Sequence, residues 1–153
     1  MPRFFRRFSE GVFDEEDIRL RARELAEFVR GAAEEYGLDH SRIIGAGYSN
    51  GANIAAAMLL LFPRLLSAAV LFHAMVPLVP DPLPDLSGLP VFLSGGKRDT
   101  LIPPSETGRL SRLLESLGAS VRLSWQPGGH GLSEAEVMEA REWLGGLQAG
   151  SGG

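Results

Sequence analysis

The stretch "RIIGAGYSNGANIAAAMLLLF" (42–62) decides the fold of this chain. It begins with a short β-branched, apolar run, passes through a serine flanked by glycines, and ends in a long, mostly apolar run. Residues 42–49 therefore predict a buried strand, and residues 50–62 predict a helix. A strand, a sharp turn at a serine and a helix is the arrangement in which the motif G-x-S-x-G presents a nucleophile.

The rest of the chain continues this alternation on both sides of the stretch. The pattern predicts helices at 14–36, 104–118 and 132–147, and strands at 67–75, 91–99 and 120–127. A segment with five prolines (76–90) separates two of the strands and cannot be regular. Apolar strands joined through helices indicate an α/β fold, in which a mostly parallel sheet carries helices on both faces. We expect one domain over 1–147 and a flexible tail at 148–153.

Composition excludes several classes of protein. The 153 residues carry a net charge of −4 and no cysteine, which excludes disulfides, zinc thiolate sites and a cysteine nucleophile. The acidic balance argues against nucleic acid as a partner. The longest strongly apolar run (54–62) is too short to span a bilayer, and the basic start is followed by acidic residues rather than by an apolar export segment. The sequence predicts no membrane span and a cytoplasmic location.

The motif "GYSNG" (47–51) is weak alone, because a chain with 19 glycines produces such a match by chance in roughly one shuffled sequence in five. Its context favours a nucleophile elbow. Helix and strand pass close together at such a turn, and Gly47, Gly51 and Ala52 are small enough to allow this. The alternative is the dinucleotide fingerprint G-x-G-x-x-G, which is disfavoured because Asn50 stands where the third glycine is needed.

A nucleophilic Ser49 needs a base, and the base is usually oriented by a carboxylate. Asp99 and His130 follow later strands, in the chain order Ser, Asp, His that this kind of elbow uses. Both are expected at the carboxyl edge of the sheet, where catalytic groups of open α/β sheets gather. The alternatives are an exposed loop aspartate and a surface histidine.

The other two histidines are weaker candidates. His40 precedes the elbow strand, at the opposite end of the sheet, and is expected to face solvent. His73 lies near the end of the second strand, where a packed core histidine is favoured over a residue that lines a pocket. Three scattered histidines do not form a cluster with metal-ligand spacing, so the sequence predicts no metal and no cofactor.

Several segments taken together resemble the α/β-hydrolase superfamily, and specifically the phospholipase/carboxylesterase group related to acyl-protein thioesterases and dienelactone hydrolases. The segments are "FFRRFSEGVFDEEDI" (4–18), "GYSNGANIA" (47–55), "AMVPL" (74–78), "GGKRDTLIPP" (95–104) and "WQPGGHGLS" (125–133). The resemblance implies Ser49 as nucleophile, Asp99 as orienting acid and His130 as general base. It also implies that the backbone N–H of Asn50 contributes to an oxyanion hole.

The resemblance covers nearly the whole chain but begins partway along the family pattern. Family members carry several strands and a helix before this point, with a His-Gly-rich loop that supplies a second oxyanion donor. We therefore expect this sequence to correspond to the C-terminal part of such a hydrolase, with the elbow strand at an edge of the sheet. Marginal stability and weak activity follow from that expectation. A homodimer that pairs through residues 42–48 would restore part of what is missing.

The leading hypothesis is a serine hydrolase that cleaves small-molecule carboxylic esters with small or medium acyl groups. Tyr48 and the residues that open the proline-rich loop (Met75, Val76, Pro77 and Leu78) are expected to line the substrate pocket. The alternative is a non-catalytic hydrolase remnant that serves as a binding or assembly module. Within enzymes, a thioesterase or a lactone hydrolase stays open.

Overall fold

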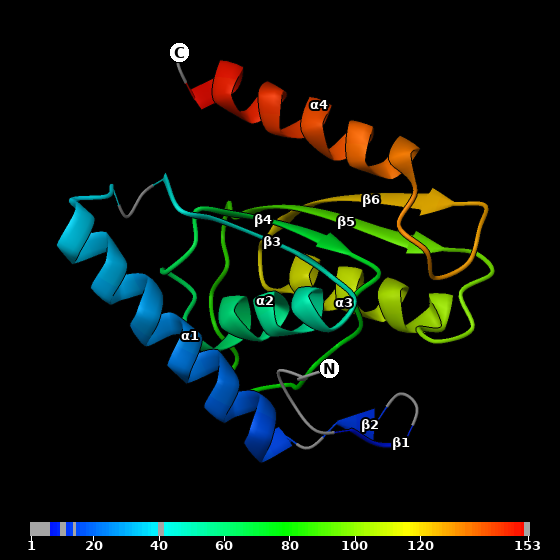
Figure 1. Cartoon of the computed structure of the whole chain (residues 1–153), viewed down its shortest axis with the longest axis horizontal. Helices are drawn as coiled ribbons and strands as arrows, with labels where there is room; N and C mark the ends of the chain where they lie inside the picture. The colour runs from blue at the N-terminus through cyan, green and yellow to red at the C-terminus, as the bar shows by residue number, and fades with distance from the viewer. Residues whose placement is uncertain (1–6, 10–11, 14, 40–41, 152–153) are drawn as a thin grey trace.

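A parallel four-stranded sheet forms the centre of the molecule, with strand order β3-β4-β5-β6 (Figure 1). The computed structural model describes residues 7–9, 12–13, 15–39 and 42–151. The strands are β3 (Ile44–Tyr48), β4 (Ala68–Phe72), β5 (Pro90–Gly96) and β6 (Ser120–Gln126). Every neighbouring pair is parallel, as the alternation of apolar strands and helices predicts.

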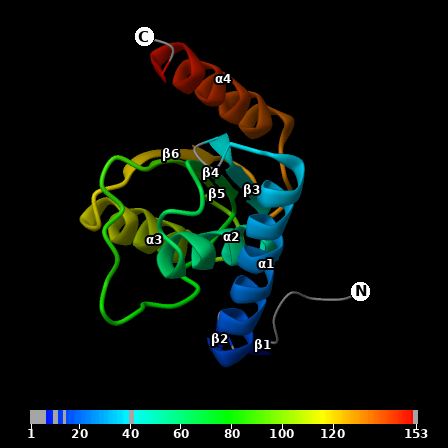
Figure 2. The ribbon, with the colours of Figure 1, turned by 90° about the vertical axis from the view of Figure 1, so that its left-hand side faces the viewer.

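Helices cover both faces of this sheet. The helices α2 (Asn50–Leu61) and α3 (Pro104–Ser116) lie on one face, and α4 (Glu134–Ser151) lies on the other (Figures 1 and 2). The long helix α1 (Glu15–Tyr36) packs against α2. The predicted α/β architecture with helices on both faces is therefore confirmed.

The main hydrophobic core lies between α2, α1 and the sheet. Helix α2 is apolar on all sides because α1 covers the face that points away from the strands, and Ile54, Leu59 and Leu60 are almost fully buried. A smaller cluster joins the other face of the sheet to α4, where Val70 and Phe92 are packed with Ala140. Burial of α2 on all sides holds its first turn, and hence the elbow, in a fixed position.

Some predicted boundaries differ from the structure. Strand β4 ends at Phe72 rather than at residue 75, because His73 adopts a left-handed backbone conformation (φ 58°) that turns the chain out of the sheet. Helix α4 continues to Ser151, beyond the predicted end at 147. A short antiparallel pair, β1 (Arg7–Ser9) with β2 (Val12–Phe13), was not predicted. His40 lies outside the described residues.

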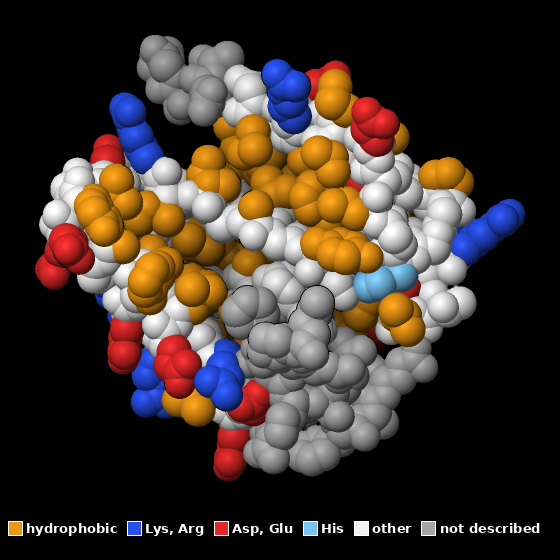
Figure 3. All heavy atoms as spheres, in the orientation of Figure 1, with side chains coloured by type: hydrophobic (Ala, Val, Ile, Leu, Met, Phe, Trp, Pro, Cys, Tyr) orange, Lys and Arg blue, Asp and Glu red, His pale blue; other side chains and the backbone are white. Residues whose placement is uncertain are grey.

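Strand β3 forms one edge of the sheet, as expected from the sequence. Its side chains at Ile44, Ala46 and Tyr48 are exposed, and hydrophobic surface is visible across this face of the molecule (Figure 3). None of the helices in the described part of the chain is both long enough and apolar enough to cross a membrane.

Candidate active site

Ser49 occupies the turn between β3 and α2 in a strained backbone conformation. Its φ is 57°, a region that residues other than glycine rarely adopt. The N–H of Ser49 donates a hydrogen bond to the carbonyl of Phe72 (2.9 Å), which ties the turn to the neighbouring strand. The Ser49 hydroxyl makes no cap with α2, although the residue stands at the N-cap position. Its side chain is therefore presented away from the helix.

Close approach of strand and helix at the turn depends on Gly47. A Cβ added there would lie 2.5 Å from the carbonyl carbon of Gly51 and 2.7 Å from the backbone nitrogen of Ala52. The prediction that Gly51 must be small for the same reason is wrong, because a Cβ at Gly51 meets no described atom within 4 Å. The steric requirement falls on Gly47 because its α-carbon, unlike that of Gly51, faces the opposing backbone.

The structure brings Ser49, His130 and Asp99 together at the carboxyl edge of the sheet. The Oγ of Ser49 lies 2.8 Å from Nε2 of His130, and Nδ1 of His130 lies 2.7 Å from Oδ2 of Asp99. The Asp99 carboxylate can only accept a hydrogen bond, so the proton of a neutral His130 is assigned to Nδ1, which donates to Asp99. The other ring nitrogen, Nε2, then accepts from the Ser49 hydroxyl. This is the order of contacts that activates a serine nucleophile.

Asp99 is almost completely buried and holds four hydrogen bonds. Its Oδ1 accepts from the backbone N–H groups of Leu101 (2.9 Å) and Ile102 (2.8 Å), and its Oδ2 faces His130 and His73. Burial by itself would raise the pKa of Asp99, but hydrogen bonds from Ile102, the two histidines and Leu101 outweigh it and lower the pKa. Asp99 is therefore a buried carboxylate, and the alternative of an exposed loop aspartate is excluded.

The loop that carries His130 is held by neighbouring backbone and by Tyr48. The Tyr48 hydroxyl donates to the carbonyl oxygen of His130 (2.6 Å). Burial, with the nearby charges of Asp99 and Glu136, raises the pKa of Tyr48, which keeps its hydroxyl protonated as a donor. The backbone of Arg98 also donates to the carbonyl of Gly128 (3.0 Å), so the loops of the acid and the base are joined directly.

Two residues that the sequence did not place in the site lie directly behind Ser49, His130 and Asp99, which are called the triad below. His73 is fully buried, as expected of a core histidine, but its Nδ1 lies 3.1 Å from Oδ2 of Asp99. Its Nε2 faces both carboxylate oxygens of Glu136, at 3.0 and 3.1 Å. The pattern S-x-x-E that begins at Ser133 is typical of a helix cap, and Glu136 also makes this cap at the start of α4.

The loop after β4 is fixed to the elbow helix. The side-chain oxygen of Asn53 accepts a hydrogen bond from the N–H of Met75 (2.9 Å), and the hydroxyl of Thr107 donates to the carbonyl of Ala74 (2.7 Å). All the residues predicted from this loop to line a substrate pocket are buried: Met75, Val76, Pro77 and Leu78. Their side chains pack inward here, so a role in acyl binding stays a prediction.

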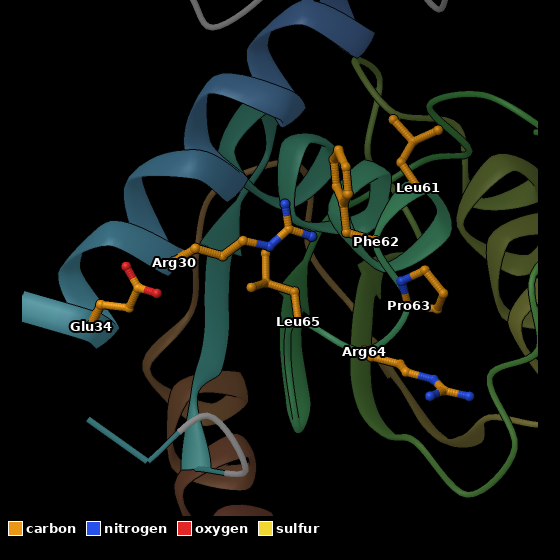
Figure 4. A pocket seen from close by; sticks show the side chains of 7 residues that line it. All are labelled: Arg30, Glu34, Leu61, Phe62, Pro63, Arg64 and Leu65. Carbon is orange, nitrogen blue, oxygen red and sulfur yellow. The ribbon is translucent and has the colours of Figure 1, made fainter. Parts of the chain in front are cut away.

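A cavity of about 490 Å³ lies away from the triad (Figure 4). It is formed by the C-terminal end of α2 and the adjacent α1, and its lining residues are Arg30, Glu34, Leu61, Phe62, Pro63, Arg64 and Leu65. Since α2 is 12 residues long, its two ends lie roughly 17 Å apart. The cavity therefore cannot hold a group that reacts with Ser49.

The same side chains could also be considered as metal ligands. The ligand atoms of His73, Asp99 and His130 lie within 4.8 Å of one another. Both histidines are hydrogen-bonded to one oxygen of Asp99, and Nε2 of His130 already faces Ser49. The hydrogen-bonded arrangement accounts for this grouping, so we assign no metal ligands, and the absence of a metal or cofactor stays a prediction.

A parallel sheet with a serine elbow, and with an acid and a histidine at the ends of following strands, defines the α/β-hydrolase class of fold. The model of the Phospholipase/Carboxylesterase family matches residues 5–147, and the chain belongs to this family. The predicted family and the assignment to esterase-type hydrolases are thus confirmed.

Individual relatives agree with this assignment. A Bacillus subtilis (strain 168) protein named "Putative hydrolase MhqD" is 50% identical over 143 residues, which cover 94% of this chain and 72% of that protein. The Bacillus cereus carboxylesterase is 47% identical to this chain, and its crystal structure superposes with a TM-score of 0.89. The match covers 94% of this chain and 68% of that one. A carboxylesterase from Mesorhizobium loti is 31% identical with a TM-score of 0.86, and the match covers 94% and 68% of the two chains.

Proposed function

We propose that this chain is a serine hydrolase that cleaves carboxylic esters through an acyl-enzyme intermediate. The observation that carries the proposal is the continuous row of contacts from Ser49 Oγ to His130 (2.8 Å) and from His130 to Asp99 (2.7 Å). The strained backbone of Ser49 supports it, because such strain gathers at sites where a side chain must be held in position.

In the first half of the reaction, Ser49 Oγ attacks the ester carbonyl carbon while Nε2 of His130 takes the hydroxyl proton. Asp99 stabilises the imidazolium that forms and keeps the ring oriented. The tetrahedral intermediate then collapses, the C–O bond to the alcohol breaks, and His130 gives its proton to the departing alkoxide. The products of this half are the free alcohol and an ester of Ser49.

In the second half, a water molecule replaces the alcohol. His130 removes a proton from the water molecule as the water oxygen attacks the acyl carbon. His130 then gives this proton to Ser49 Oγ as the carboxylic acid leaves. Asn50 is the first residue of α2, so its backbone N–H points out of the positive end of the helix. We assign this N–H to the oxyanion in both halves of the reaction.

The proposed substrates are small-molecule esters with small or medium acyl groups. Tyr48 is partly exposed beside His130, with ring centroids 5.3 Å apart, and offers an aromatic surface at the reacting centre. Two of the structural relatives, from Bacillus cereus and Mesorhizobium loti, are carboxylesterases, which supports an ester over a thioester or a lactone. We further propose that the enzyme acts in the cytoplasm.

A fluorophosphonate probe tests the proposal directly, because it bonds only to an activated serine. Intact mass should increase by one probe in the wild-type chain and stay unchanged in Ser49→Ala. Ser105→Ala is a matched control, because Ser105 is exposed on α3 and takes no part in the triad, and it should be labelled at the wild-type rate. If folded wild-type protein takes up no probe, or if Ser49→Ala is labelled equally, the chain is better explained as a non-catalytic binding module.

A further inference from the structure

His73 lies between two carboxylates in the fully buried region behind the triad. Its Nδ1 faces Asp99 Oδ2 at 3.1 Å, and its Nε2 faces the two oxygens of Glu136 at 3.0 and 3.1 Å. His73 and Glu136 are both 0% exposed, so water does not separate or screen these contacts. The row Ser49–His130–Asp99 therefore continues through His73 to Glu136.

The number of hydrogen-bond donors available between His73 and the two carboxylates determines where the protons of this hydrogen-bonded row lie. A neutral imidazole has one N–H and one acceptor nitrogen, and an acceptor nitrogen 3.0 Å from a carboxylate oxygen would place two lone pairs against each other. Both carboxylates already accept other hydrogen bonds. Asp99 takes the N–H groups of Leu101 and Ile102, and Glu136 takes the hydroxyl of Ser94 (2.6 Å) and the N–H of Ser133 (2.7 Å).

Those contacts favour the ionised form of each carboxyl. Burial by itself would raise the pKa of Glu136, but the hydrogen bonds from Ser94, Ser133 and His73, together with the charge of His73, lower it. A proton is needed in each of the two contacts between His73 and the carboxylates, and both protons are then carried by His73 rather than by Asp99 or Glu136. Other groups that face the row are the Tyr48 ring, 5.7 Å from the His73 ring, and the His130 ring, 5.5 Å from it.

We propose that His73 is a positioning residue of the active site, held as an imidazolium with a proton on both ring nitrogens, and that Glu136 is its counter-ion. The Nδ1–H of His73 holds Oδ2 of Asp99 in the place where that oxygen accepts the Nδ1–H of His130. The positive charge of His73 offsets one of the two buried negative charges, so His130 faces a net charge of −1 from the row. The kinetic part of this inference rests on the proposed function, whereas the position of the proton does not.

Two substitutions change this net charge in opposite directions. Glu136→Gln keeps the shape of the side chain and can still cap α4, but it changes the charge of the row from −1 to 0. His73→Gln keeps an amide donor for Asp99 but changes the charge from −1 to −2. The double variant returns the charge to −1.

The first experiment locates the proton by ¹⁵N NMR of the wild-type chain labelled at histidine. Both His73 nitrogens should resonate as protonated imidazolium at pH 7. A neutral His73 with a single N–H in the wild type would overturn the proposal, whether or not the chain hydrolyses esters.

The second experiment measures kcat/KM for a p-nitrophenyl ester as a function of pH. The acid limb should move to lower pH in Glu136→Gln and to higher pH in His73→Gln, by roughly 0.5–1 pH unit each, and should return towards the wild type in the double variant. The loss should be in kcat, with KM little changed, because neither side chain contacts the substrate. A purely structural role would lower activity without opposite displacements of the acid limb.

Acid limbs that coincide in all four proteins, or that move in the same direction in both single variants, would overturn the proposal. If His73→Gln does not fold, the wild-type NMR spectrum and the displacement in Glu136→Gln still decide it. Fluorophosphonate labelling of Ser49 separates the two levels of inference. An unlabelled protein with a doubly protonated His73 contradicts the proposed function alone.

Discussion

Replacement of Gly47 by alanine should damage both the stability and the reactivity of the site. The added methyl group would lie 2.5 Å from the carbonyl carbon of Gly51, 2.6 Å from its oxygen, and 2.7 Å from the nitrogen of Ala52. All three neighbours are backbone atoms in the first turn of α2, and no side chain can rotate to make room. Strand β3 and helix α2 must therefore move apart.

The size of the effect follows from the packing of α2. Overpacking a fixed region costs about 1–3 kcal/mol, and the upper part of this range is expected because α2 is buried on all sides. The elbow would also be displaced from His130, and a shift of about 1 Å can reduce the rate about 100-fold. The contact at risk is the 2.8 Å approach of Ser49 Oγ to His130 Nε2.

Gly51→Ala is the matched control, because a methyl group there meets no described atom within 4 Å. In the first turn of a helix, this change should stabilise the chain by about 0.4–1 kcal/mol. Urea unfolding measures the stabilities, and the rate of fluorophosphonate labelling measures the reactivity of Ser49. If Gly47→Ala is as stable and as reactive as Gly51→Ala, the strand and helix do not depend on Gly47, and this account of the elbow is refuted.

Three further predictions concern the surroundings of the triad. Asn53→Ala should lower the free energy of unfolding by about 1–3 kcal/mol in urea melts, because the N–H of Met75 loses its buried partner; unchanged stability would contradict this. Tyr48→Phe removes a hydrogen bond to the carbonyl of the proposed base and should slow ester hydrolysis about 2- to 10-fold, and an unaltered rate would show that the bond has no such role. The pKa values of Asp99 and Glu136 are lowered in the folded state, so both carboxylates stabilise the fold when they are ionised. This stabilisation is complete above the pKa values of the unfolded chain, about 3.9 and 4.3, and is lost as pH falls through the lower pKa values of the folded state. Thermal unfolding between pH 2 and 6 should show this loss, with a smaller fall in Glu136→Gln, and a melting temperature independent of pH would contradict it.

Much of the candidate site could be predicted because parallel strands end at the same edge of a sheet. Once residues 42–49, 91–99 and 120–127 are recognised as parallel strands, Ser49, Asp99 and His130 must emerge near one another. The motif around Ser49 also predicts its own strained turn, because its local pattern of strand, small residues and helix allows few other conformations.

The surroundings of the triad could not be predicted in the same way. Glu136 has a local role as a helix cap, which accounts fully for its place in the sequence and conceals its contact with His73, 63 residues away. The hydrogen bonds by which Asn53 and Thr107 hold the start of the proline-rich loop against the core have no signal in the sequence either. Such contacts depend on how separate helices pack on the sheet, and no short pattern records that.

The sequence by itself determined the class of fold, the strand–turn–helix around Ser49 and the placing of Ser49, Asp99 and His130 after successive strands, because each depends on local patterning and on the direction of the strands. Only the tertiary structure decided that β3 ends in a turn requiring glycine at 47 but not at 51, since this depends on distances between backbones. It alone also showed that Asp99 is shared by two histidines and that Glu136 lies behind them. The physical reason is that the charge and orientation of a buried acid are set by every group packed around it, and those groups come from the segments that follow β4 and β6 and from α4, as well as from its own loop.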